Sequence, residues 1–437
     1  MSENIKETIQ KNKMSKYQMV VVAICLMINM LDGFDVLVMA FTAASVAQEW
    51  QLVDTAIGLL LSAGLIGMAC GSVFIAPLAD RLGRPMLVLV CLVVISLGMM
   101  LSAVSQNLQQ LIVLRVFTGL GIGGMLASLN VIVAEYASDK WRSFALSLLQ
   151  TGYPIGAVIG GTIAAFLIVH SGWRSVFLFG AIASLVMIPL VIWRLPESLD
   201  FLLAKRPVNA LQKINFLLNK MGKSAVKEIP VDNNQNAVVT ASLNTLFKHG
   251  MQRTTLLVWI SYFMVMFSFY FVLSWTPKLL VEAGLSKQMG ISAGVIINLG
   301  GVIGGILLGV ISSKFSLKKI IGFYMLATAI FMMIFALGSA NLLATLVLGV
   351  LIGFFLFGSM IGLYAMVPDL YPAIVRATGM GWAIGVGRIG AILSPMFAGL
   401  LLDWQWQGHH LFFVFAIPLL LSVLTVMTIK AGENNRS

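Results

Sequence analysis

Long apolar stretches, separated by short polar ones, run through the whole chain. A helix that crosses the apolar core of a bilayer, about 30 Å thick, needs about 20 mainly apolar residues. Twelve stretches are long enough, namely 17–44, 55–76, 86–105, 109–134, 143–169, 173–193, 254–275, 290–312, 319–338, 341–367, 377–401 and 409–430. The pattern therefore predicts an all-α polytopic membrane protein with twelve transmembrane helices.

The longest polar gap divides the twelve stretches six plus six. The predicted parts are a cytoplasmic N-terminal tail, a first six-helix bundle, a cytoplasmic central loop, a second six-helix bundle and a cytoplasmic C-terminal tail: 1–16, 17–193, 194–253, 254–430 and 431–437. Within the central loop, the apolar positions of 199–219 predict short amphipathic helices. The polar stretch 228–240 is typical of a flexible linker.

Matching charge spacings in the two halves predict a duplicated architecture. Glu135 precedes Arg142 by seven residues, and Asp369 precedes Arg376 by the same seven, at an offset of 234 residues. The glycines that lie fourteen residues after each arginine match as well. Two repeats related in this way are typical of pseudo-symmetric bundles around a central cavity.

The basic residues indicate the orientation. An even number of spans places both termini on the same side of the membrane. Only Arg174, Lys278 and Lys287 fall on the side opposite to the termini, and only Arg115 and Arg388 lie deep inside spans. All other lysines and arginines share the side of the termini, so the positive-inside rule places both termini in the cytoplasm.

Composition supports the membrane class and argues against nucleic-acid binding and against metal binding by the cysteines. Of 437 residues, 59% are hydrophobic and only 10% are charged, more apolar surface than a soluble chain of this length can cover. The net charge of +11 follows topology and lipid contact, so it does not indicate nucleic-acid binding. Cys25, Cys70 and Cys91 all fall in apolar stretches without metal-ligand spacing, which favours packing roles.

Two carboxylates lie deep in the first apolar stretch. Asp32 and Asp35 are three residues apart, so they share one helix face. A charged side chain in the middle of a bilayer costs roughly 2.5–3.5 kcal/mol even on insertion scales. We therefore expect this face to line a protein or water cavity and not lipid. Gly33, between them, allows a second helix or a ligand to approach the backbone.

The turn after the second stretch combines an acid, two arginines and a glycine: Asp80, Arg81, Gly83 and Arg84. Asp80 at a helix end can accept hydrogen bonds from a neighbouring helix N-terminus, and the arginines can pair with Glu135. Such contacts would close the cytoplasmic side and break when it opens. The alternative is that these charges only set the topology.

Two arginines inside spans need partners. Arg115 lies near the depth inferred for Asp35, which predicts an ion pair between them. Arg388 is twelve residues past Arg376, roughly 18 Å into the membrane, with no acid nearby on its own helix. A buried, always charged guanidinium is a natural partner for a carboxylate ligand. Purely structural roles are the alternative for both arginines.

Aromatic residues supply candidate walls for a flat ligand. Tyr153, beside Pro154, could stack on or hydrogen-bond a ligand, and Tyr270 and Trp382 belong to aromatic-rich spans. Ordinary core packing is the alternative for each.

Several of these features together carry a resemblance to a known family. The stretch 71–84 resembles the loop signature of the major facilitator superfamily. With Asp32-Gly33-Phe34-Asp35, Arg115 and Gly387-Arg388-Ile389-Gly390, the chain resembles the aromatic acid/proton symporter family within it. Residue by residue, Asp32 and Asp35 match the family's span-one acids; Asp80, Arg81, Gly83 and Arg84 match its loop; Glu135 and Arg142 match the end of span four and the following loop.

This resemblance implies the major facilitator fold and proton-coupled import of a small aromatic carboxylate by alternating access. The implied substrate is benzoate, hydroxybenzoate, protocatechuate or a related acid such as muconate, and the implied location is a bacterial inner membrane. We expect Asp32 and Asp35 to couple protons. We expect the substrate to contact Arg388, Arg115, Tyr153, Tyr270 and Trp382.

The expected partners are the substrate, protons and the bilayer, and we expect a monomer. We expect no cofactor, no metal and no enzymatic activity, because the chain has no nucleotide loop, paired metal ligands or Ser/His/Asp set. Two alternatives stay open at this point: a drug or metabolite exporter of the same fold, and a membrane sensor or channel. The two arginines inside spans favour an anion over an apolar or cationic substrate.

Overall fold

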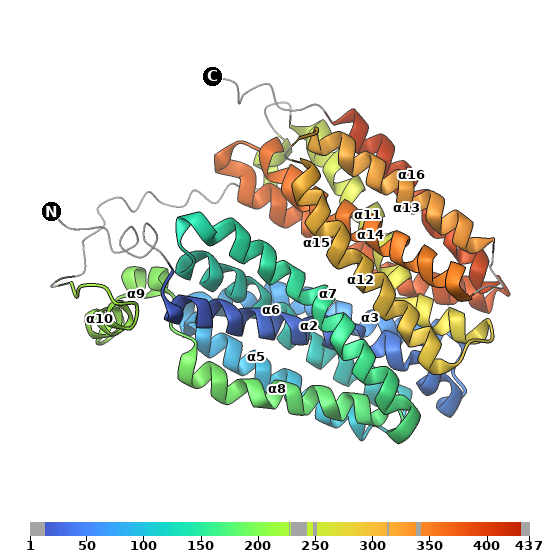
Figure 1. Cartoon of the computed structure of the whole chain (residues 1–437), viewed down its shortest axis with the longest axis horizontal. Helices are drawn as coiled ribbons and strands as arrows, with labels where there is room; N and C mark the ends of the chain where they lie inside the picture. The colour runs from blue at the N-terminus through green and yellow to red at the C-terminus, as the bar shows by residue number, and fades with distance from the viewer. Residues whose placement is uncertain are drawn as a thin grey trace. The chain divides into compact units, whose positions relative to one another are not determined.

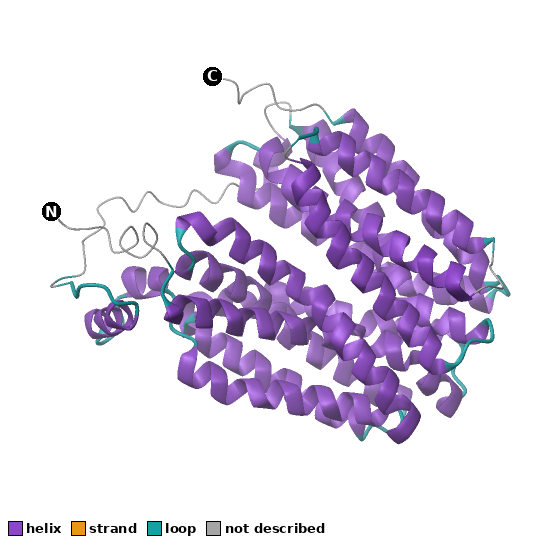
Figure 2. Cartoon of the chain, in the orientation of Figure 1, coloured by secondary structure: helices purple, strands orange, loops and turns teal. Residues whose placement is uncertain are grey.

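The computed structural model describes residues 14–226, 228, 243–247, 251–312, 314–337 and 342–429. All regular structure in these residues is helical (Figure 2). Residues 1–13 of the predicted N-terminal tail, the predicted linker apart from residue 228, and the predicted tail 431–437 lie outside the described residues.

Twelve helical segments of the described residues are long and apolar enough to cross a membrane, which confirms the predicted number. Their main helices are α2 (Lys16–Trp50), α3 (Asp54–Cys70), α5 (Arg84–Ala103), α6 (Leu108–Tyr136), α7 (Asp139–Ser171), α8 (Arg174–Arg194), α11 (Gln252–Glu282), α12 (Lys287–Ser312), α13 (Leu317–Ala336), α14 (Leu342–Met366), α15 (Ala373–Asp403) and α16 (Gly408–Thr428) (Figure 1). The side of the membrane on which the termini lie stays a prediction from the charge distribution.

Helix α3 does not end where its apolar stretch ends. It continues through a π-helical turn η1 (Gly71–Ile75), a 3₁₀ turn η2 (Ala76–Leu78) and the short helix α4 (Ala79–Leu82). Pro77 has no N–H to donate, so the α-helical pattern changes locally without the chain turning away. The predicted loop is therefore helical up to Leu82, and the turn itself is Gly83.

Polar side chains inside the spans are satisfied mostly by their own helices. Thr42, Ser102, Thr118 and Thr328 each donate to the carbonyl oxygen four residues earlier, at 2.7–2.8 Å. Within lipid no water is available for these groups, so a bond to the same helix removes the cost of burying them.

The described central loop contains two short helices, α9 (Leu199–Lys205) and α10 (Ala210–Lys220), within the stretch where short helices were predicted. Ser198 begins α9 as its N-cap and accepts a hydrogen bond from the backbone N–H of Phe201. Between the helices, Arg206 and Asn209 have left-handed backbone angles on either side of Pro207, which separates α9 from α10. A short 3₁₀ turn, η3 (Leu243–Phe247), precedes α11.

Contacts divide the chain into two compact units. The first holds Met1–Val36, Ile66–Gly156 and Arg174–Gln235; the second holds Leu37–Leu65, Ala157–Trp173 and Asn236–Ser437. In the first unit, α5 packs against both α6 and α8. In the second unit, α11 packs against α15 and α16, α12 against α14, and α13 against α14 and α16. Helices α2, α3 and α7 each contribute residues to both units. The predicted boundary between two bundles at 194–253 stays a prediction.

Candidate functional site

The two aspartates of α2 are enclosed by protein. The side chains of Asp32 and Asp35 are each 1% exposed. None of their four carboxylate oxygens has a hydrogen-bond partner among the described residues. A carboxylate oxygen of Asp35 lies next to Gly180 of α8. The predicted polar face of α2 therefore points into the interior of the first unit, as expected for charges kept away from lipid.

Arg115 of α6 lies in the same interior and is 1% exposed. Its Nη2 donates to the backbone carbonyl oxygen of Asp35 at 2.6 Å, and its Nη1 lies 3.2 Å from the sulfur of Met99. The guanidinium carbon is 5.8 Å from the centre of the Phe177 ring, a cation–π distance. The predicted ion pair with the Asp35 carboxylate is thus wrong for this structure, because the arginine bonds the main chain of that residue instead.

Close backbone packing places Tyr153 beside the acids. A side chain at Gly33 of α2 would overlap the carbonyl oxygen of Tyr153 in α7, and one at Gly156 would overlap that of Met30. Asn29 donates from Nδ2 to the carbonyl oxygen of Leu149. Gly33 therefore admits a second helix, as predicted. Tyr153 is half-buried at this helix contact.

A separate cationic site lies in the second unit. Arg388 of α15 is half-buried, and no acid of the described residues forms an ion pair with it. Its positive charge acts on the hydroxyl groups of Tyr270 in α11 and Tyr364 in α14. The ring of Tyr262 meets that of Tyr364 edge to face, with 5.7 Å between centres. The structure thus places the predicted Tyr270, and also Tyr364, within electrostatic range of Arg388, and no acid of the described residues pairs with this guanidinium.

Trp382 lies apart from this group. It precedes Arg388 by six residues on α15, about 9 Å along the helix axis. Its side chain is 44% exposed and stacks on Trp259, with 5.9 Å between ring centres. A substrate contact of Trp382 stays a prediction.

The predicted contact between Arg84 and Glu135 is present. Arg84 forms an ion pair with Glu135, whose side chain is about 7% exposed, and also bonds the Ser198 hydroxyl at 2.8 Å. Gly83, which forms the turn before α5, has a φ of 88°, a backbone conformation that favours glycine. Asp80 and Arg81 are exposed and Arg142 is half-buried, so the structure does not bring these three predicted residues into the cluster.

Sequence reasoning missed two members of this cluster, Glu197 and Ser198. Glu135 accepts hydrogen bonds from the Ser198 hydroxyl at 2.9 Å and from the Leu199 backbone N–H at 2.8 Å, so it binds the start of α9. Glu197 accepts from the backbone N–H of Arg84 at 2.9 Å, and its carboxylate fills the space beside Gly83. The available signal was a Ser directly before an amphipathic stretch, which is typical of an N-cap.

Burial raises the pKa of the Glu197 carboxyl, and the hydrogen bonds from the Ser198 and Arg84 backbones oppose that rise. The hydroxyl of Tyr136 donates to the Glu197 carbonyl oxygen at 2.7 Å, which ties the same segment to the end of α6. The beginning of the central loop is therefore bonded to the turn after α4 and to the end of α6.

The predicted placement of Lys278 outside the spans is wrong. This lysine lies within α11, and its side chain is 3% exposed. It forms ion pairs with Asp54 of α3 and with Glu282, one turn further along α11. The spacing of four residues between Lys278 and Glu282 was the signal for a helix that continues past the apolar stretch.

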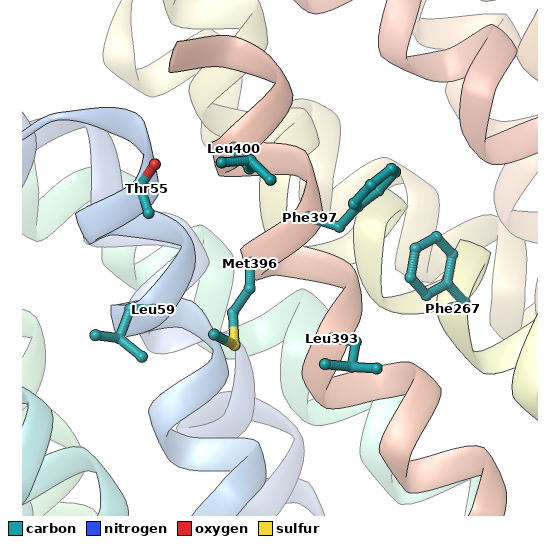
Figure 3. A pocket seen from close by; sticks show the side chains of 7 residues that line it. All are labelled: Thr55, Leu59, Phe267, Leu393, Met396, Phe397 and Leu400. Carbon is teal, nitrogen blue, oxygen red and sulfur yellow. The ribbon is translucent and has the colours of Figure 1, made fainter. Parts of the chain in front are cut away.

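The second unit also contains an apolar pocket of about 590 Å³ (Figure 3). Thr55 and Leu59 of α3, Phe267 of α11, and Leu393, Met396, Phe397 and Leu400 of α15 line it. The Thr55 hydroxyl donates to Asp403, so the lining offers no free cation or hydroxyl group to a carboxylate. This pocket is therefore not the anion site.

Comparisons with known proteins agree with the resemblance found in the sequence. Residues 22–337 and 296–436 match the family described as Major Facilitator Superfamily. The chain is 33% identical to a gallate transporter of Pseudomonas putida, over 97% of this chain and 94% of that protein. It is 30% identical to the 4-hydroxybenzoate transporter PcaK of Pseudomonas aeruginosa, over 97% of this chain and 95% of that protein.

Among solved structures, the chain is similar to the xylose transporter XylE from E. coli in a partially occluded inward open conformation. The TM-score is 0.76 at 16% identity, over 97% of this chain and all of that one. At this identity the likeness concerns the fold alone.

Proposed function

Because this chain belongs to the Major Facilitator Superfamily, we propose that it imports a small aromatic carboxylate together with protons, by alternating access, across a bacterial inner membrane. The chain is a multi-pass membrane transporter and not an enzyme. The substrates named for its relatives, gallate and 4-hydroxybenzoate, support the class of substrate.

The observation that carries the proposal is that Arg388 has no counter-ion among the described residues. A guanidinium in a membrane span needs an anion or water around it, since a lone charge in an apolar medium is costly. An arginine offers paired N–H donors that match the two oxygens of a carboxylate. Tyr270 and Tyr364 add hydroxyl groups within range of the same charge. A carboxylate that also carries an aromatic ring fits this combination of charge and aromatic side chains.

The buried group formed by Asp32 and Asp35 of α2 and Arg115 of α6 supports proton coupling. With Asp32, Asp35 and Arg115 all ionised, its net charge is −1, and one proton on either acid brings it to zero. Because Arg115 bonds the backbone of Asp35, both carboxylates keep their oxygens available to a proton. Binding and release of a proton at this group change a buried charge, which alters the stability of the surrounding helix packing.

In the proposed cycle, a proton binds at Asp35 or Asp32 from outside and the substrate carboxylate binds at Arg388. The protein then changes conformation, and the proton and the anion leave inside. A monoanion carried with one proton moves no net charge. Transport with more protons would be electrogenic.

Proteoliposome uptake tests this function. Labelled benzoate, 4-hydroxybenzoate and gallate would be offered with and without an inward pH step, and xylose would serve as an uncharged control. We expect uphill accumulation of at least one carboxylate only with the pH step, and none of xylose. Equal uptake with and without the step would contradict proton coupling. Efflux of apolar cations without carboxylate uptake would favour the exporter.

A further inference from the structure

Helix α3 begins at a carboxylate supplied by another helix. The Asp403 carboxylate, at the last residue of α15, accepts hydrogen bonds from the backbone N–H groups of Asp54 and Thr55, both at 3.0 Å. It also accepts the Thr55 hydroxyl proton. The first N–H groups of a helix have no partner within the helix, and an acid there also complements the helix dipole. Asp403 therefore acts as an N-cap provided from a distant part of the chain.

A buried lysine joins the same helix end to α11. The Lys278 Nζ lies 2.7 Å from a carboxylate oxygen of Asp54, and the side chain is 3% exposed. The Lys278 Nζ also lies 5.2 Å from the centre of the Trp275 ring, and its charge acts on Asp403. Removal of one partner from such a buried pair leaves an uncompensated charge.

One helical turn away from these charges, the backbones of α3 and α15 are in contact. A side chain at Gly58 would lie 2.5 Å from the carbonyl oxygen of Pro395, and one at Gly399 would overlap that of Asp54. The Ser62 hydroxyl donates to the carbonyl oxygen of Ile392 at 2.7 Å. Over these turns nothing as large as a substrate can pass between the two helices.

All of these residues belong to the second compact unit, yet α3 comes from the first half of the sequence and α11 and α15 from the second. We propose that Asp54, Lys278 and Asp403 form a charge clamp that closes the transport path at this end of α3 and opens once in each transport cycle. The proposal rests on the proposed function in one respect, alternating access.

Charges suit a contact that must both form and break. In the closed state the pair is compensated, and in an open state each partner is hydrated at little cost. An apolar contact of the same size would lose its burial free energy on opening and would favour the closed state permanently. The clamp thus keeps the two states close in free energy while the Gly58 contact keeps the closed one tight.

The test measures opening directly. Val53, 64% exposed, directly precedes α3, and Gln405, also exposed, lies two residues after the end of α15. Both flank the clamp and accept spin labels, with Cys25, Cys70 and Cys91 replaced by alanine. In detergent, double electron–electron resonance gives the distance distribution between the labels. For Lys278→Met we expect about a tenfold rise in the ratio of long to short distances. For the double variant Lys278→Met/Asp54→Asn we expect a return towards the parent distribution, because the negative charge that paired with Lys278 is gone as well.

Glu282→Gln is the matched control. Glu282 also pairs with Lys278 but lies on the same helix, so its loss leaves the connection between α3 and α11 in place and the distances should not change. An unchanged distribution in a folded, monodisperse Lys278→Met protein overturns the clamp. If the distances respond while no aromatic acid is taken up, the proposed substrate fails and the clamp stands.

Discussion

The two halves of the chain repeat the same charge spacing but use it differently. Glu135 is 6% exposed and binds Arg84, Ser198 and the first N–H of α9. Its counterpart in the repeat, Asp369, is exposed. Arg376, the counterpart of Arg142, is exposed as well. A repeated pair of charges thus marks equivalent helix ends, whereas a bonded cluster also needs partners from elsewhere in the chain.

The arginines inside the spans differ in the same sense. In the first half, Arg115 is enclosed and bonds the backbone of Asp35. In the second half, Arg388 is half-buried without an acidic partner among the described residues. The offset of 234 places Pro154 where the second half has Arg388, so this arginine is not part of the repeat. The arginine of the first half thus has an internal hydrogen-bond acceptor, and the arginine of the second half is left available to a ligand.

The largest expected effect tests that availability. Arg388→Ala should weaken aromatic carboxylate binding about 100-fold, close to 3 kcal/mol, because a charged hydrogen-bonding partner is removed from a desolvated site. Isothermal titration in detergent measures the affinity, and Arg388→Lys should recover only part of it, since an ammonium lacks the paired donors. An unchanged affinity in Arg388→Ala would mean that the second half does not bind the anion.

The next largest effect tests the buried group of the first half, Asp32, Asp35 and Arg115. Asp35→Asn keeps the size of the side chain and removes the proton site. With a pH step of one unit, an ideal one-proton symporter accumulates its substrate about tenfold, and the variant should reach only equal concentrations on both sides. Exchange of labelled for unlabelled substrate at equal pH should persist, which separates lost coupling from lost folding. Full accumulation in both Asp35→Asn and Asp32→Asn would contradict this role.

Local sequence features predicted the helices well because apolar length is a local property. The twelve spans and the helices α9 and α10 needed only their own residues. Their ends were less predictable. Helix α2 reaches Trp50, well past the predicted residue 44, because no glycine or proline follows to stop it. A hydropathy profile detects where a chain is apolar and not where its helix ends.

Site residues were predictable where two opposite charges lie at predicted helix ends and can form an ion pair, as for Arg84 and Glu135. Glu197 and Ser198 join that cluster from more than a hundred residues beyond Arg84 in sequence, and no local signal predicts that contact. Depth along a helix placed Arg115 near Asp35 correctly. It did not distinguish the carboxylate from the backbone oxygen, because that choice depends on the side-chain rotamer of Arg115, which also contacts Met99 and Phe177.

A smaller effect tests the bonded cluster of the first half. Glu135→Gln keeps two acceptor or donor atoms but removes the charge that faces Arg84. We expect the free energy of unfolding to fall by about 1 kcal/mol, which is close to a fivefold change in a two-state equilibrium constant. The effect is modest because the ion pair is only partly shielded from water. Proteolysis between α8 and α11 should become faster by a similar factor, because α9 loses the acid that binds its first N–H. Unchanged proteolysis would show that Ser198 alone fixes α9.

The smallest effect comes from the same substitution made in the repeat. Asp369→Asn removes an exposed charge that has no bonded partner among the described residues. We therefore expect a change in the free energy of unfolding within about 0.5 kcal/mol and an uptake rate equal to that of the parent protein. Measured beside Glu135→Gln, it serves as the matched control, since both variants neutralise an acid seven residues before an arginine. Equal losses in the two variants would contradict the difference between the halves, because an exposed aspartate would then contribute as much as a bonded glutamate. A loss confined to Glu135→Gln would assign the effect to Arg84, Ser198 and the start of α9, and not to the shared spacing.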